Sequence, residues 1–94
     1  MKSAASSVWA IRYTDRALRD LRSLDSVVRR RIIDFMDKRV AGLRDPRQIG
    51  ERLHGKLGTF WRFRIGDYRA ICEIKEELVT VIVVVIGHRR EIYR

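Results

Sequence analysis

The chain has 94 residues, which is enough for one hydrophobic core and too few for two independently folding domains. Hydrophobic residues make up 46% of it and no repeat or low-complexity tract is present, which excludes a disordered chain and a solenoid. With 21 Lys and Arg against 12 Asp and Glu, the formal net charge is +9, which indicates a polyanionic partner, either nucleic acid or an acidic protein.

The basic residues are mostly arginine. Because guanidinium forms bidentate contacts with phosphate and ammonium does not, the excess of arginine over lysine favours phosphate binding. Cys72 is the only cysteine, which excludes an internal disulfide and a cysteine-cluster metal site and fits a reducing cytoplasm. Residues 1–7 lack the apolar centre of a signal peptide, and the apolar run 79–87 is far shorter than the roughly 20 residues of a membrane helix. We expect a flexible tail over residues 1–7 and a single domain over 8–94.

Residues 8–13 alternate and are rich in β-formers, which predicts a first strand. Thr14 then stands at an N-cap position, and a short amphipathic helix follows until Asp25 or Ser26 ends it and caps the next. The apolar stripe of this second helix consists of Val28, Ile32, Phe35, Met36 and Val40. Two helices joined so closely predict an antiparallel αα-hairpin.

Residues 42–51 contain Pro46 and Gly50, which predict a loop. Three β-segments follow, near 59–65, 68–74 and 78–86, and the last is apolar on both faces, as expected of a central strand covered on both sides. This order predicts an α+β fold, β-α-α-β-β-β, in which the helical hairpin packs against one face of a small, mainly antiparallel sheet.

The second and third of these segments meet at a two-residue turn, which predicts that Arg64 lies opposite Arg69. Their β-carbons would be only about 4.5–5.5 Å apart, and like charges in that position are destabilising. An intervening carboxylate, from Glu73 or Asp67, would offset the repulsion. A bound phosphate explains the placement better, because an anion between guanidiniums turns the repulsion into a binding site.

Three segments together resemble the RelE/ParE superfamily of bacterial toxins, and more closely its RelE-like branch of ribosome-dependent messenger-RNA endonucleases. They are "WAIRYTDRALRDLRSLD", "DPRQIGERLHGKLGTFWRFRIGDYRAI" and "GHRREIY". The resemblance implies a cytoplasmic toxin that enters the ribosomal A site and cuts the message with the RNA 2′-hydroxyl as nucleophile, without metal or cofactor. It also implies a cognate RelB-like antitoxin, operator DNA binding only through the antitoxin complex, and no membrane partner.

The resemblance also assigns site residues. Arg62 and Arg64 match two basic residues on the strand of the family's active face, Arg69 matches the arginine of its "YR" step, Arg89 the arginine after the final strand, and Tyr93 the tyrosine near the C-terminus. Guanidiniums placed in advance oppose the negative charge that develops on phosphorus, so Arg69 and Arg89 are expected to bind the transition state. Tyr93 is suited to stack on a base, orient the 2′-hydroxyl or transfer a proton.

The two central basic positions are lysine in the best-known family members, where one is a candidate general base. Arginine, with a pKa above about 12, is a poor proton acceptor, so His88 is the natural replacement, since histidine ordinarily has a pKa near 6.5. Lys56 and Arg90 are expected to contact RNA. The arginine run 29–31 is interpreted as a solvated helix face, with RNA contact as the alternative. Because the chain stops just after Tyr93, no C-terminal helix is expected.

Two other functions fit the same pattern. A ParE-like inhibitor of DNA gyrase would share the fold and the central segment without nuclease chemistry, whereas Arg89 and Tyr93 beside a basic hairpin favour RNA. An inactive relative that only binds RNA or an antitoxin is the third possibility.

Overall fold

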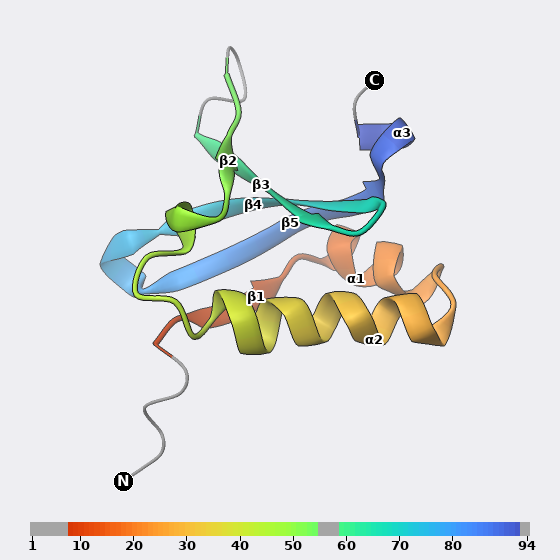
Figure 1. The fold of residues 1–94 in the computed structure, drawn as a ribbon, viewed down its shortest axis with the longest axis horizontal. Coiled ribbons are helices and arrows are strands. Elements are labelled where there is room, and N and C mark those ends of the chain that lie inside the picture. The colour runs from red at the N-terminus through yellow and green to blue at the C-terminus, as the bar shows by residue number, and fades with distance from the viewer. Residues whose placement is uncertain (1–7, 55–58, 93–94) are drawn as a thin grey trace, which may run out of the picture.

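The computed structural model describes residues 8–54 and 59–92, and shows a mixed five-stranded sheet with two helices against one face (Figure 1). The strands are β1 (Ala10–Tyr13), β2 (Glu51–Arg52), β3 (Phe60–Ile65), β4 (Tyr68–Lys75) and β5 (Thr80–His88). Their order across the sheet is β1-β5-β4-β3-β2, with β1 parallel to β5 and the other neighbours antiparallel. The predicted α+β fold is confirmed.

Both predicted helix starts are confirmed by side-chain caps. Helix α1 (Asp15–Arg22) begins after Thr14, whose hydroxyl oxygen accepts a hydrogen bond of 3.1 Å from Ala17 N. Helix α2 (Ser26–Asp34) begins after Asp25, whose carboxylate accepts hydrogen bonds of 3.0 Å from Val27 N and Val28 N. The chain continues from α2 as a π-helix over Phe35–Val40. These caps satisfy amide groups that have no partner within the helix.

The core lies between α2 with its π-helical continuation and the inner strands of the sheet. Of the predicted apolar stripe, Ile32, Met36 and Val40 are fully buried. Phe63 of β3 and Val83 of β5 are equally buried from the sheet side. Burying large side chains of this kind is the main favourable contribution to folding, at about 1.5–3 kcal/mol each.

The predicted loop over residues 42–51 contains two short elements instead. The Asp45 carboxylate accepts hydrogen bonds from Arg47 N at 3.0 Å and Arg47 Nε at 2.9 Å, and a 3₁₀ turn (Pro46–Gln48) follows. Gly50 then lies so close to Phe63 that a β-carbon on it would be 3.1 Å from the ring. This close approach brings the chain to the edge of the sheet as β2, with Glu51 opposite Arg62.

Strand β5 is an inner strand, as predicted, between β1 and β4. Its pairing with β4 shifts by one residue, because Val83 and Val85 face consecutive residues of β4 and Val84 is the extra residue of a β-bulge. Beyond the end of β1, side chains cover the edge of β5: Thr14 Oγ1 donates to Val84 O at 2.8 Å, and Asp20 Oδ2 accepts from Ile86 N at 2.9 Å.

A short helix α3 (Arg89–Ile92) follows β5, so the expectation of no C-terminal helix is wrong. Its first backbone amide, Arg89 N, donates a 2.8 Å hydrogen bond to Asp67 O in the β3–β4 turn, and this contact ties α3 to the hairpin. Across the described residues, every helix is too short or too polar to cross a membrane.

Candidate functional site

The predicted register of the β3–β4 hairpin is confirmed, including Arg64 directly opposite Arg69. Gly66, the first residue of the two-residue turn, has a φ of +61°, which suits a primed hairpin turn. Phe63 and Ala70, the neighbouring residues on these strands, are fully buried toward the helices. Because side chains alternate along a strand, both arginines belong to the opposite face, called here the arginine face.

A carboxylate connects two arginines of the arginine face. Glu51 Oε1 accepts a 3.2 Å hydrogen bond from Arg62 Nε and lies 3.5 Å from Arg64 Nε. The predicted local candidates have other roles, since Glu73 pairs with Lys75 at 3.1 Å and Asp67 lies in the turn. The carboxylate found here is thus Glu51 of β2, an element that the sequence did not predict, and it joins Arg62 to Arg64 instead of lying between Arg64 and Arg69.

Arg64 and Arg69 differ in exposure although they face each other. The Arg64 side chain is 61% exposed, whereas Arg69 is only 5% exposed. Arg69 Nη1 donates hydrogen bonds of 2.9 Å to both Gly66 O and Tyr68 O. Arg69 thus braces the turn from within and contributes a buried positive charge, while Arg64 presents its guanidinium to solvent.

His88 lies on the other face of the sheet. It pairs with Tyr68, and their rings meet edge to face with centroids 5.5 Å apart. Tyr68 packs against the core on the helix side. His88 Nδ1 accepts a 3.2 Å hydrogen bond from Arg90 N in the first turn of α3. A neutral His88 therefore carries its proton on Nε2, and its ring supports α3.

Residues 11–93 match the sequence model of a protein family. The family is described as the ParE toxin of the type II toxin-antitoxin system parDE. The chain belongs to the RelE/ParE superfamily of toxins. A curated relative, Toxin RelG of Mycobacterium tuberculosis, is 30% identical over 86 residues, which cover 92% of this chain and 97% of the relative.

Solved toxin structures share the fold. The toxin-antitoxin complex RelBE2 from Mycobacterium tuberculosis matches with a TM-score of 0.81 and 28% identity, over 88% of this chain and 93% of that one. A mutant of Escherichia coli toxin RelE in the free state matches with a TM-score of 0.69 and 25% identity, over 92% and 90% of the two chains. This protein is thus a type II toxin with a RelE-like fold.

The structure brings together only part of the toxin's predicted site. Arg62, Arg64 and Arg69 share the arginine face, and Arg89 and Arg90 are exposed at the start of α3. His88 lies on the helix side, and Lys56 and Tyr93 lie outside the described residues.

Two residues near this site were not singled out by sequence reasoning. Glu51 follows a glycine in a segment without periodicity, and only its pairing with β3 reveals its position. Arg31, interpreted as part of a solvated face, lies against Gly66 at the turn. The described residues hold no group of three or more His, Cys, Asp or Glu side chains that could bind a metal.

Proposed function

We propose that this toxin is a ribosome-dependent endoribonuclease that cuts messenger RNA in the A site, with the RNA 2′-hydroxyl as nucleophile, and so inhibits translation. The observation that carries the proposal is the pair of guanidiniums of Arg62 and Arg64, both held by Glu51. They belong to the face of the sheet opposite α1 and α2 (Figure 1), and the strand pairing places Arg64 near the end of β5 where α3 begins. Arginine pairs of this kind suit a phosphodiester, because guanidinium binds phosphate oxygens with two parallel hydrogen bonds.

In this reaction the deprotonated 2′-oxygen attacks the adjacent phosphorus, and the bond from phosphorus to the 5′-oxygen breaks. A 2′,3′-cyclic phosphate forms, the leaving 5′-oxygen takes up a proton, and negative charge accumulates on the phosphoryl oxygens along the way. Exposed Arg64 and Arg89 contact those oxygens, and Arg69 adds positive charge from beneath the surface. Fixed positive groups lower the barrier because they need no reorganisation as the charge develops. Tyr93 stacks on a base or shifts a proton, and His88 places α3 and thereby Arg89. Lys56, Arg62 and Arg90 bind flanking phosphates.

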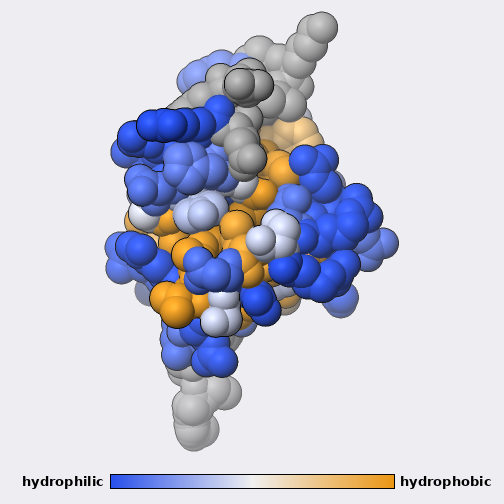
Figure 2. Space-filling model, turned by 90° about the vertical axis from the view of Figure 1, so that its right-hand side faces the viewer, coloured by the Kyte–Doolittle hydropathy of each residue, from blue (hydrophilic) through white to orange (hydrophobic). Residues whose placement is uncertain are grey.

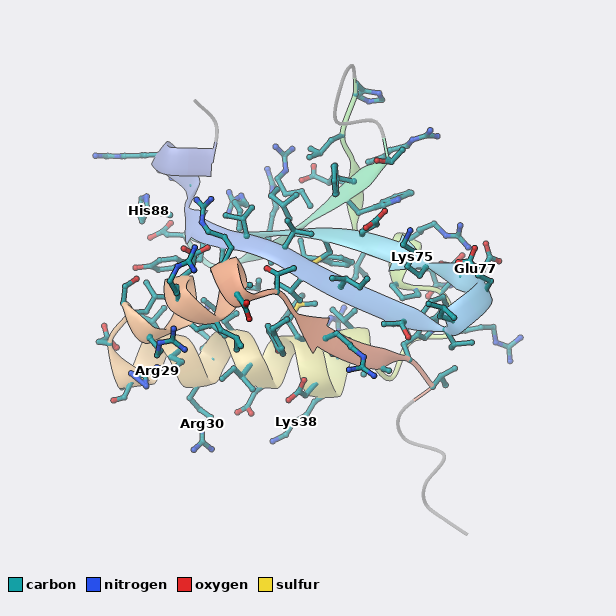
Figure 3. The ribbon with its side chains drawn as sticks, turned by 180° about the vertical axis from the view of Figure 1, so that it is seen from behind. Arg29, Arg30, Lys38, Lys75, Glu77 and His88 are labelled. Atoms are coloured by element: carbon teal, nitrogen blue, oxygen red, sulfur yellow. The ribbon has the colours of Figure 1, made fainter. Side chains whose placement is uncertain are left out.

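The test is to add the purified toxin to a translating extract and map the ends of the cleaved messages. Cleavage within A-site codons is expected, and the Arg64→Ala/Arg89→Ala double variant should be slower by about a hundredfold or more. Arg30→Ala is the matched control, because Arg30 points from α2 away from the sheet (Figure 3). Translation arrest with intact messages would refute the proposal.

The description of the matching family favours a second candidate, a ParE-like inhibitor of DNA gyrase. That activity involves no nuclease chemistry. Broken chromosomal DNA, with messages intact and Arg64→Ala as toxic as the wild type, would identify this function.

We also infer a cognate, acidic RelB-like antitoxin in the same cytoplasm, since similar toxins were solved in toxin-antitoxin complexes, RelBE2 and RelBE. Operator DNA would be bound only through that complex. The end of the molecule in Figure 2 shows an apolar area bordered by hydrophilic residues, as at many protein interfaces. A groove of about 300 Å³ between α1 and β5 offers one docking place. Its lining is mixed, with apolar Leu24, Val85 and Ile86 beside Gly87 and the polar Arg16, Asp20 and Ser23. Leu24→Arg should weaken copurification with the antitoxin.

A further inference from the structure

Glu51 occupies a fixed place at the edge of the sheet. The preceding residue, Gly50, lies against the Phe63 ring, and Leu53 N donates to Phe60 O at 3.0 Å, so β2 is held on both sides of Glu51. This register puts Glu51 opposite Arg62. The carboxylate is therefore positioned by the backbone and not only by its own ion pairs.

Both ion pairs of Glu51 use one carboxylate oxygen and the Nε edge of each guanidinium. A guanidinium has two further nitrogens, Nη1 and Nη2, at its outer end. The contact with Glu51 leaves the outer end of the 61% exposed Arg64 side chain directed to solvent. Glu51 thus holds Arg64 by its Nε and leaves the outer nitrogens, which can form a bidentate phosphate contact, at the exposed end of the side chain.

We propose that Glu51 is a positioning residue of the toxin's phosphate site. It aligns Arg62 and Arg64 for the RNA backbone, and this role rests on the proposed nuclease function. The contact between Glu51 and the 61% exposed Arg64 side chain contributes little to folding, so stability alone does not account for a carboxylate that reaches this second arginine.

Charge and geometry make opposite predictions for removal of the carboxylate. Losing a negative charge beside Arg62 and Arg64 should tighten binding of RNA phosphate at low salt, by up to about fivefold for an exposed site. Losing the alignment should slow the cleavage step, by about ten- to a hundredfold, because catalysis depends on the positions of groups around phosphorus. A residue with a purely structural role would not produce this split between affinity and rate.

The experiment compares the full-length wild type with Glu51→Gln and Glu51→Ala. Glutamine keeps an oxygen that can accept from Nε without the charge, whereas alanine removes both. Glu73→Gln is the matched control, since Glu73 lies on the arginine face, carries the same charge and pairs with Lys75 instead. Binding is measured with a fluorescent single-stranded RNA whose riboses are all 2′-O-methylated, and cleavage with programmed ribosomes.

Both Glu51 variants should bind the modified RNA more tightly than the wild type, and the cleavage rate should fall in the order wild type, Gln, Ala. Glu73→Gln should match the wild type in both assays. If both Glu51 variants behave like Glu73→Gln, or cleave faster than the wild type, Glu51 has no positioning role. If the wild type does not cleave at all, the nuclease proposal fails, whereas wild-type cleavage without the split overturns only the role of Glu51.

Discussion

The guanidinium of Arg31 lies directly against Gly66, so that a β-carbon on Gly66 would be 3.1 to 3.2 Å from three of its atoms. Arg31 belongs to α2, and Gly66 begins the turn of the hairpin that carries the arginine face. The turn is thereby held from three directions: Arg31 packs on it, Arg69 donates to Gly66 O and Arg89 N donates to Asp67 O.

Gly66→Ala should therefore destabilise the toxin. The left-handed conformation at φ +61° costs about 1–2 kcal/mol for a residue with a β-carbon, before any displacement of Arg31. Gly66→Asn should cost less, since asparagine tolerates this region better. Denaturant unfolding measures both variants. When Arg31→Ala is added to Gly66→Ala, it should restore only the part of the lost free energy of unfolding that comes from the clash with Arg31. A Gly66→Ala protein as stable as the wild type would contradict the turn geometry.

Arg69→Ala should lower the free energy of unfolding by about 1–3 kcal/mol, because it leaves the carbonyls of Gly66 and Tyr68 without this charged donor. Arg64→Ala, at an exposed position, should change it by no more than about 0.5 kcal/mol. Thermal or urea unfolding of the two variants checks the difference. Equal stabilities would show that the buried guanidinium does not brace the hairpin, and loss of activity in Arg69→Ala must be judged against its folded fraction.

Local signals in the sequence predicted most of the fold correctly. The caps at Thr14 and Asp25 and the turn at Gly66 each depend on one or two residues with a defined conformational preference, so they can be recognised without the tertiary structure. Strand β2 has only two residues and no periodicity, and its existence depends on Gly50 packing against Phe63. The carboxylate that joins Arg62 and Arg64 therefore could not be predicted from the local sequence.

The face on which His88 lies could not be predicted for a different reason. Val81 and Val83 are fully buried on the helix side, and simple alternation from them would put His88 on the arginine face. The bulge at Val84 reverses the alternation, so Ile86 is buried and His88 joins Tyr68 on the helix side. A bulge depends on pairing with the neighbouring strand, and the uniform run of valines gives no sign of it.

Val79 offers a route to a more stable toxin. It follows the 3₁₀ turn Glu76–Leu78 with a φ of +47°, a conformation that is costly for a β-branched side chain, and it is 42% exposed. Val79→Asn should raise the free energy of unfolding by about 1 kcal/mol and leave the Ala10 N to Val79 O hydrogen bond in place. The melting temperature measures this, with the exposed Val27→Asn as control. A lower melting temperature for Val79→Asn than for this control would argue against strain.

Cys72 should make stability depend on alkaline pH. Complete burial raises the pKa of its thiol well above the ordinary value, so the unfolded chain releases this proton at lower pH than the native protein. The buried thiol's contribution to the free energy of unfolding is fully present below the ordinary thiol pKa of about 8.5. It is lost as pH rises above that value, and the loss is about 1–2 kcal/mol near pH 10. Urea unfolding should show that the free energy of unfolding decreases less between pH 7 and pH 10 in Cys72→Ala than in the wild type. An identical decrease in both proteins would exclude the thiol as its cause.

His88 can act on the reaction through α3 or by moving a proton, and two substitutions separate these roles. His88→Asn keeps a side-chain oxygen near the position of Nδ1, able to accept from Arg90 N, but cannot transfer a proton at neutral pH, whereas His88→Ala loses both abilities. If His88 supports α3, as the contacts with Arg90 and Tyr68 indicate, the asparagine variant should retain most cleavage activity and the alanine variant should lose about tenfold or more. Single-turnover cleavage on programmed ribosomes measures the rates across pH 6 to 9. Equal losses in both variants, together with disappearance of a pH-dependent step, would instead make His88 a proton-transfer residue.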